Sequence, residues 1–235
     1  MISLIFPTYN ESESIAETLK NIRSLQIPAL EIIVCDDHSP DHTLEAAAAA
    51  DSDAVLLTHD GPKGLSPSVI YAFKQAKGDI LVCMDADGQH RPADLPALIQ
   101  AIEKSGFAVG SRFVPGGGFQ DKWPWYRLLV SRVSAWLAKV FLHTEIRDPM
   151  SGFFGLKRDI FLKILPCTDP GGFKIMLELA TFANALIRDL QITEVPILFA
   201  NRKAGKSKAS IRIGMQYLRM LFSCRKRLKQ LNKSH

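Results

Sequence analysis

Two carboxylates, Asp85 and Asp87, constrain this chain more than any other feature, because they directly follow a strand-like apolar run, 79–83. Side chains two residues apart point to the same side of an extended backbone. In open α/β sheets, ligands bind outside the carboxyl ends of the strands. With the Gln89 amide nearby, the pair suits a divalent cation, since Mg²⁺ usually takes one or two carboxylates, water and phosphate oxygens. A solvated acidic turn is the alternative.

Strand-like apolar runs alternate with helix-like patterns along the first 110 residues. Strands that alternate with helices of 10–15 residues indicate βαβ units and a mostly parallel sheet. Further on come a flexible glycine-rich loop at 114–118 and a loop at 148–152, and Pro196 places the last strand at an edge or a bulge. The predicted strands are 2–6, 31–35, 54–57, 80–84, 107–110 and 192–199, and the predicted helices are 13–24, one through 47–50, 67–76, 92–104, 125–142 and 173–187.

The composition fits one α/β domain, or one domain with an appendage, because the chain has 235 residues and 47% of them are hydrophobic. The four cysteines form no CxxC pair, and Cys35 and Cys83 lie in apolar runs, so we expect reduced core residues. We expect no signal peptide, since the first residues lead directly into a strand. No apolar stretch approaches the ~20 residues of a transmembrane helix.

Charge is distributed unevenly along the chain. From residue 201 onward there are eleven Lys and Arg residues and no acid, whereas the first 200 residues carry a net charge of −6. This bias suggests that the C-terminal segment contacts an anionic surface or ligand. The predicted organisation is a main domain, 1–209, and a basic amphipathic helix, 210–235.

Two stripes define that amphipathic helix. One stripe is polar and basic: Arg212, Gln216, Arg219, Ser223 and Lys226. The other is apolar: Ile211, Met215, Leu218 and Phe222, widened by Tyr217, Met220 and Leu221. This pattern predicts a helix lying on a membrane surface. The alternative is a helix that packs its apolar stripe on the main domain, or on a membrane-spanning partner subunit.

Charged and turn-forming residues gather in five segments that follow predicted strands. They are PTYNE (7–11), DDHSPDHT (36–43), DADGQ (85–89), GSR (110–112) and NRKAGKSK (201–208). Each alone is an ordinary loop, since Asp41 and Thr43, for example, are common residues at helix N-termini. Acids in three segments and bases in two, all at one edge of the sheet, predict a single metal-plus-anion site.

The same segments belong to a longer ordered series of motifs. It adds KGLS (63–66), GSRF (110–113), GGG (116–118), DPMSGFFGLKR (148–158), GGFKIMLEL (171–179) and EVPILFANRKAGKSK (194–208). With this series the chain resembles the dolichol- or polyprenol-phosphate mannosyltransferases, which are inverting family-2 glycosyltransferases. The resemblance implies a GT-A fold: a Rossmann-like, mostly parallel sheet flanked by helices, here with a C-terminal amphipathic helix.

The resemblance also implies roles for matching residues. The nucleoside pocket is lined by Pro7, Tyr9, Glu11, Val34 and Asp36, and ribose or sugar is contacted by Asp85 and Ala86. Mg²⁺ or Mn²⁺ beside the diphosphate is ligated by Asp87 and Gln89, with support from Asp85. Anionic oxygens of donor and acceptor are met by Arg112, Lys174, Arg202 and Lys208. The acceptor phosphate is held by Arg127 and Ser131, one helical turn apart. The expected catalytic residues are Asp87, Arg112, Arg127 and Ser131.

Three of the residues in these motifs and in the predicted long helix are also compatible with an ordinary structural role. Arg127 is also compatible with a solvated helix position, and Lys174 with a plain surface lysine. Glu178 lies one turn beyond Lys174 and is compatible with a simple ion pair to it.

The chain departs from the family pattern at four positions. His38 and His42 stand where glycines are usual, Ser66 replaces a glycine, and Lys206 replaces an acid. The first three bear on nucleotide preference or loop geometry, and Lys206 adds positive charge near the diphosphate. No metal ligand is lost, and the spacing of the loop histidines, His90 included, fits no zinc site.

The resemblance implies a metal-dependent transfer of a hexosyl group, with mannose from GDP-mannose as the first choice, to a polyprenyl or dolichyl phosphate with inversion. The acceptor phosphate is already anionic, so a strong general base is unnecessary, while metal and basic side chains stabilise the leaving diphosphate. One alternative is a related transferase using UDP-glucose or another donor or acceptor. The other is a catalytically silent membrane-surface subunit. We expect a peripheral protein on the cytoplasmic face of a membrane and no nucleic-acid partner.

Overall fold

The computed structural model describes residues 1–121, 123–169, 172, 174–200 and 211–231. Helices and strands alternate along most of the chain, as the sequence predicts. In chain order they are β1 (Ile2–Thr8), α1 (Ser12–Ser24), β2 (Leu30–Asp36), α2 (Thr43–Ala50), β3 (Val55–Thr58), α3 (Leu65–Gln75), β4 (Ile80–Cys83), η1 (Pro92–Asp94), α4 (Leu95–Ser105), β5 (Phe107–Ser111), β6 (Gly118–Phe119), α5 (Trp125–Leu142), β7 (Phe154–Lys157), α6 (Arg158–Ile164), η2 (Leu165–Cys167), α7 (Ile175–Leu186), β8 (Ile192–Pro196), β9 (Leu198–Phe199) and α8 (Ile211–Leu231).

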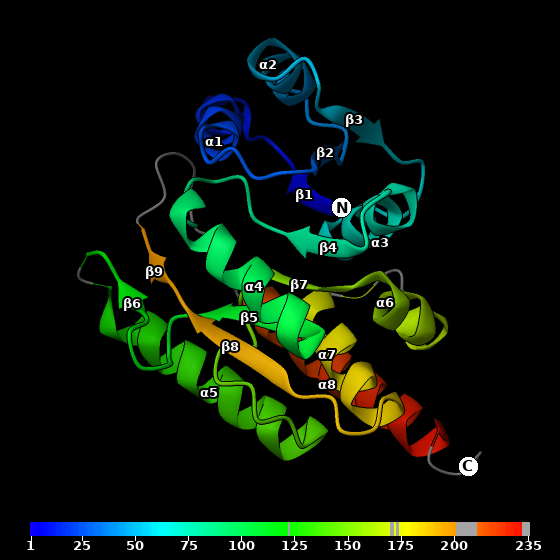
Figure 1. Cartoon of the computed structure of the whole chain (residues 1–235). Coiled ribbons are helices and arrows are strands. Elements are labelled where there is room, and N and C mark those ends of the chain that lie inside the picture. Colours follow the sequence, from blue (N-terminus) through cyan, green and yellow to red (C-terminus); the bar gives the residue numbers. More distant parts are fainter. Residues whose placement is uncertain (122, 170–171, 173, 201–210, 232–235) are drawn as a thin grey trace.

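A seven-stranded sheet in the order β3-β2-β1-β4-β7-β5-β8 forms the centre of the molecule (Figure 1). Its strands are parallel except β7, which lies between β4 and β5 and is antiparallel to both. The sequence predicts only a short apolar segment at β7. Because β7 runs in the opposite direction, the loop before it arrives at the edge where the parallel strands end. That loop carries Asp148 and Gly152 to the predicted site.

Two apolar clusters cover the two faces of the sheet. Leu4 and Phe6 of β1 pack with residues of α1, α2 and α4, whereas Ile5 packs with residues of α3, α6, α7 and α8. This division follows from the alternation of side chains along a strand. Cys35 and Cys83 are buried with unbonded thiols, as the sequence predicts. The helices on both faces confirm the predicted fold class.

The last predicted strand, 192–199, is divided at Pro196. β8 ends there at the edge of the large sheet, and β9 pairs with β6 in a separate two-stranded sheet. This agrees with the expectation of an edge or bulge, since proline cannot donate a ladder hydrogen bond. The glycine-rich loop therefore leads into a short strand.

The C-terminal helix α8 is present and packs against α5 and α7. Tyr217, Met220 and Leu221 of its apolar side are buried, and the Tyr217 hydroxyl donates a 2.8 Å hydrogen bond to the carbonyl oxygen of Ser134. Met215, Leu218 and Phe222 remain exposed. Part of the apolar stripe thus serves the core of the main domain. Within the described ranges, no helix combines the length and apolar character needed to cross a membrane.

Substitutions on the two sides of α8 should separate these roles. Leu221→Ala should reduce the free energy of unfolding by about 2–5 kcal/mol, because a fully buried leucine leaves a cavity. Leu218→Ala on the exposed side should change it by about 1 kcal/mol or less. Urea unfolding of both variants checks this, and equal losses would contradict the packing described here.

Candidate active site

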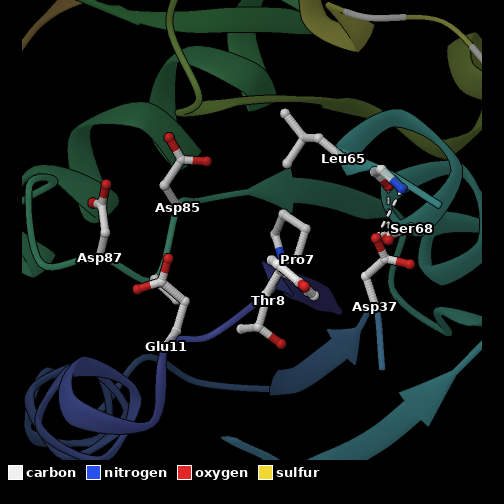
Figure 2. A pocket seen from close by; sticks show the side chains of 11 residues that line it. Pro7, Thr8, Glu11, Asp37, Leu65, Ser68, Asp85 and Asp87 are labelled. Carbon is white, nitrogen blue, oxygen red and sulfur yellow. Dashed lines mark hydrogen bonds between the residues drawn. The ribbon is translucent and has the colours of Figure 1, made fainter. Parts of the chain in front are cut away.

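A cavity of about 280 Å³ opens at the carboxyl ends of β1, β2 and β4, and Figure 2 shows it from close by. Glu11, Asp85 and Asp87 gather on one side of it, and Asp37 and Ser68 lie on the other (Figure 2). Six residues predicted to bind donor or metal line this cavity. They are Pro7, Tyr9, Glu11, Asp85, Ala86 and Asp87.

Close packing fixes Asp85 in this cavity. Gly152 approaches so tightly that a Cβ atom there would lie 2.0 Å from Asp85 Oδ2. On another side, His90 Nε2 lies 3.6 Å from the same oxygen, and the His90 ring packs between Phe153 and Phe199. The glycine of the SGFF motif is therefore required by the position of the carboxylate.

The oxygen donors of this cavity fit a hard divalent cation. Asp85 and Asp87 both line it, and Asp87 is 5% exposed. Among the residues that the structure describes, no three His, Cys, Asp or Glu side chains form a cage for a metal ion. Mg²⁺ typically takes one or two carboxylates and completes its shell with water and phosphate oxygens. The pair suits a cation that is held jointly with a phosphate ligand.

Gln89 contributes to the end of β9 as well as to the acidic loop. Its backbone N–H donates to Asp87 Oδ1 at 3.0 Å, and its side-chain nitrogen donates to the Ala200 carbonyl oxygen at 3.2 Å. Ala200 N–H donates back to the Gln89 carbonyl oxygen at 2.9 Å. The side-chain amide oxygen is the atom that a metal would use.

Two of the predicted nucleoside-pocket residues lie behind the cavity wall. Val34 is fully buried in an apolar cluster. The Asp36 carboxylate accepts hydrogen bonds from Thr8 Oγ1 at 2.8 Å and from Ser39 N–H and Oγ at 2.6 Å. Neither belongs to the cavity lining. Their side chains serve the core and the loop after β2.

Asp37, the neighbour of the predicted Asp36, is the aspartate of this pair that lines the cavity. Its Oδ2 accepts a 2.9 Å hydrogen bond from Gly64 N–H at the start of α3. Successive side chains of an extended chain point in opposite directions, so only one residue of the Asp36–Asp37 pair faces the ligand side. The sequence shows both aspartates, but it does not show the strand register that determines which of them faces the cavity.

Arg112 is held by a buried ion pair with Asp148. Its Nε and Nη2 atoms each donate to the carboxylate at 2.7 Å, and its backbone N–H donates at 3.1 Å. The guanidinium also lies 4.8 Å from the Phe199 ring centroid and 5.5 Å from that of Trp123. Arg112 therefore has a strong protein partner at the position predicted to meet substrate oxygens.

Lys174 is close to the acidic site and is not a plain surface lysine. Burial lowers the pKa of its ammonium group, the carboxylates of Asp85 and Asp148 act to raise it, and Arg112 lowers it further. Lys174 lines a second cavity of about 530 Å³, which shares Gly64 with the first. Lys174 therefore lies within electrostatic reach of Asp85 and Asp148.

The remaining predicted residues do not line the first cavity or fall outside the residues that the structure describes. Arg127 lies with its guanidinium carbon 5.7 Å from the Trp123 ring centroid, on the ring that Arg112 also contacts. Ser131, one turn further along α5, lines a separate cavity. Arg202 and Lys208 fall outside the described residues.

Comparisons with known proteins identify the family of the chain. Residues 3–165 match the family described as Glycosyl transferase family 2. The chain is 39% identical over 94% of its length to a dolichol-phosphate mannosyltransferase of Pyrococcus furiosus, and spans 62% of that protein. It is 36% identical over 93% of its length to the dolichol-phosphate mannosyltransferase of Saccharomyces cerevisiae, and spans 85% of that protein.

A solved structure supports the fold. The chain superimposes with a TM-score of 0.72 on glucosyl-3-phosphoglycerate synthase from Mycobacterium tuberculosis, crystallised with Mn²⁺, UDP and glucosyl-3-phosphoglycerate. The two sequences are 21% identical, and the match covers 97% of this chain and 80% of the other. This likeness confirms the GT-A architecture expected from the sequence.

The buried Arg112–Asp148 pair makes a stability prediction. Asp148→Asn should lower the free energy of unfolding by about 3–5 kcal/mol, because it leaves a buried guanidinium without its counter-charge. Glu145→Gln breaks the exposed Lys139–Glu145 pair and should leave the melting temperature almost unchanged. Calorimetry of both variants checks this, and a similar small change in both would show that Arg112 does not depend on Asp148.

Proposed function

The chain belongs to the family-2 glycosyltransferases, and we propose that it transfers a hexosyl group from a nucleotide-diphosphate sugar to a polyprenyl phosphate. The observation that carries the proposal is one cavity lined by Glu11, Asp85 and Asp87, with Lys174 beside it. The names of the archaeal and yeast relatives favour a mannosyl donor, and GDP-mannose is our first choice. UDP-glucose is the competing donor.

The donor diphosphate is proposed to bind at the acidic edge with Mg²⁺ or Mn²⁺. Asp87 and the Gln89 amide oxygen would hold the cation, with Asp85 in support. When bound, the cation supplies positive charge against the diphosphate as it leaves. The Mn²⁺ in the mycobacterial relative's crystals supports this assignment.

Positioning of two anions is the main task proposed for this site. The attacking group is a phosphate oxygen of the acceptor, which is already charged at neutral pH, so no side chain needs to remove a proton. Lys174 lies near the acidic edge, and Arg127 lies near Arg112. From these places both would orient the acceptor phosphate. Attack opposite the leaving diphosphate would invert the anomeric carbon. Fixed charges suit this step because they need no reorganisation during reaction.

Helix α5 supports a membrane position for the acceptor. Its side facing away from the buried Ser134 and Ala138 carries exposed apolar residues: Trp125, Tyr126, Leu129, Val130, Val133, Trp136 and Val140. We call these residues, together with Met215, Leu218 and Phe222 of α8, the apolar face. Phe141 and Phe222 join the two helices with ring centroids 4.9 Å apart. Contiguous apolar surface of this kind marks an interaction site.

We propose that the apolar face lies on a bilayer, with the cytoplasmic leaflet as the expected side. Arg127 belongs to the same helix and lies toward Trp123, so a lipid phosphate at the bilayer surface would enter beside it. Exposed Arg219 and Lys226 on α8 add attraction to anionic lipid. This extends the membrane contact predicted for residues 210–235 to α5. A membrane-spanning partner subunit is the other occupant to test.

Donor and acceptor roles should separate in two variants. GDP-mannose with Mn²⁺ should raise the melting temperature of the wild type, because a ligand that binds only the folded state stabilises it. Asp87→Ala should lose this shift and all turnover. Arg127→Ala should keep the shift but raise the KM for polyprenyl phosphate at least tenfold, as it removes an acceptor contact.

Melting curves with GDP- and UDP-sugars and a radiolabelled transfer assay provide these measurements. Donor binding without transfer to any polyprenyl phosphate would favour the silent-subunit alternative. Full turnover by Asp87→Ala in excess chelator would remove the metal from the proposal. Loss of donor affinity in Arg127→Ala would reverse the acceptor assignment.

Binding to vesicles tests the apolar face. Trp136→Glu should lower binding to anionic liposomes at low salt at least tenfold, since it places a charge at the bilayer boundary. Leu162→Glu on α6 is the control, because Leu162 is equally apolar and exposed but lies outside the apolar face. Co-sedimentation measures both. Equal binding by wild type and Trp136→Glu, or no binding by the wild type, would favour a protein partner. Truncation at residue 210 is less informative, because it removes core residues of α8.

A further inference from the structure

A buried ion pair links the C-terminal helix to α7. Arg227 of α8 donates from Nη1 to Glu178 Oε1 at 2.7 Å, and Glu178 is fully buried. The same nitrogen donates to the Cys167 carbonyl oxygen, and the guanidinium lies 5.0 Å from the Phe182 ring centroid. Glu178 thus pairs with Arg227, not with Lys174 as the sequence suggested. Arg227 is partly buried, with its side chain 25% exposed, in a helix that also carries exposed bases.

The Glu178 carboxylate also holds the described ends of the turn before α7. Asp169 N–H donates to Glu178 Oε1 at 2.6 Å, and Gly172 N–H donates to the Asp169 carbonyl oxygen at 2.9 Å. A Cβ atom on Gly172 would lie 2.7 Å from Glu178 Oε2. The carboxylate therefore binds the Asp169 end of the turn and leaves no room for a side chain at Gly172. Without it, neither Asp169 nor Gly172 has this buried anchor.

Lys174 follows that turn by two residues. Its carbonyl oxygen accepts from Glu178 N–H at 3.2 Å, in the first turn of α7, and its charge interacts with Asp85 and Asp148. The first turn of α7 therefore joins the Glu178–Arg227 pair to Lys174, which interacts with Asp85 and Asp148. A shift of the turn would move the Lys174 ammonium relative to Asp85.

Burying this ion pair costs free energy, so its presence points to a role in positioning. Removing two charges from water carries a desolvation penalty, and well-packed apolar residues often stabilise such a site equally well. Burial raises the pKa of the Glu178 carboxyl, and the Asp169 N–H and Arg227 oppose this shift. What the pair adds over apolar packing is directed hydrogen bonding to two backbone groups, the Cys167 carbonyl oxygen and the Asp169 N–H.

We propose that Arg227 and Glu178 are positioning residues that set Lys174 through the turn, so that the C-terminal helix takes part in turnover. The exposed side of the same helix carries Met215 and Phe222 of the apolar face, so contact with a bilayer would seat α8 and with it the turn. The consequence for turnover rests on the proposed function. The anchoring of the turn does not.

The test uses the full chain and two readouts. Arg227→Met should speed hydrogen exchange at the Asp169 and Gly172 amides at least tenfold. With a short polyprenyl phosphate in detergent, without a bilayer, it should lower kcat at least tenfold and leave the donor KM within twofold. Lys229→Met, at an exposed base of the same helix, is the matched control and should change neither. Arg227→Lys should recover part of both effects, because it restores the charge.

Each outcome decides a part of the proposal. Unchanged exchange in Arg227→Met overturns the anchoring. Faster exchange with unchanged kcat overturns the positioning of Lys174. If Arg227→Met fails to fold, Glu178→Gln decides, since its carboxamide keeps an acceptor for Asp169 N–H but loses the ion pair. It should show intermediate exchange, and wild-type exchange there overturns the proposal. A wild type without transferase activity refutes the proposed function, while the exchange readout still tests the anchor.

Discussion

The antiparallel insertion of β7 between β4 and β5 is the constraint on which the candidate site depends. A parallel strand at this place would deliver its preceding loop to the opposite edge of the sheet. With β7 reversed, the loop before it lies among the carboxyl ends of the other strands. Gly152 then fixes Asp85 by close packing, and Asp148 receives the Arg112 guanidinium. One reversal of strand direction therefore supplies both neighbours that hold the charged groups in place.

Local patterns made the parallel strands and the acidic pair predictable. Asp85 and Asp87 follow a buried strand, and the place of a strand end in an α/β sheet is set by topology. β7 was not predictable, because a segment of four residues, Phe154–Lys157, is too short to carry a periodicity that separates a strand from a buried turn. Which of Asp36 and Asp37 lines the cavity was not predictable for a related reason: it depends on the register, which is fixed by side chains far away in the sequence. Sequence supplied the chemistry of this edge, and packing decided which atoms face the ligand.

Helix α5 shows the opposite limit of sequence patterns. Its inward side is built largely from small residues such as Ser134 and Ala138, while Trp125 and Trp136 are exposed. A pattern-based interpretation assigns large apolar residues to the core, which is the reverse of what this helix does. In α8 the amphipathic pattern was recognised, but the apolar side is divided between the core and solvent. Only the packing of neighbouring helices distinguishes a core stripe from an interaction surface.

Under the proposed function, charge balance explains why a metal ion would serve the donor and side-chain cations would serve the acceptor. A nucleotide-diphosphate sugar brings at least two negative charges into a cavity already lined by Glu11, Asp85 and Asp87. At ~4 Å and an effective dielectric constant of about 20, each pair of like charges repels by about 4 kcal/mol. Under the proposed function, a cation arriving with the donor would offset this repulsion. The acceptor phosphate would instead meet Lys174 and Arg127, which are cations of the chain itself. Since the Glu178–Arg227 pair joins α8 to the turn before Lys174, the proposed roles predict that the acceptor step depends on the C-terminal helix more than donor binding does.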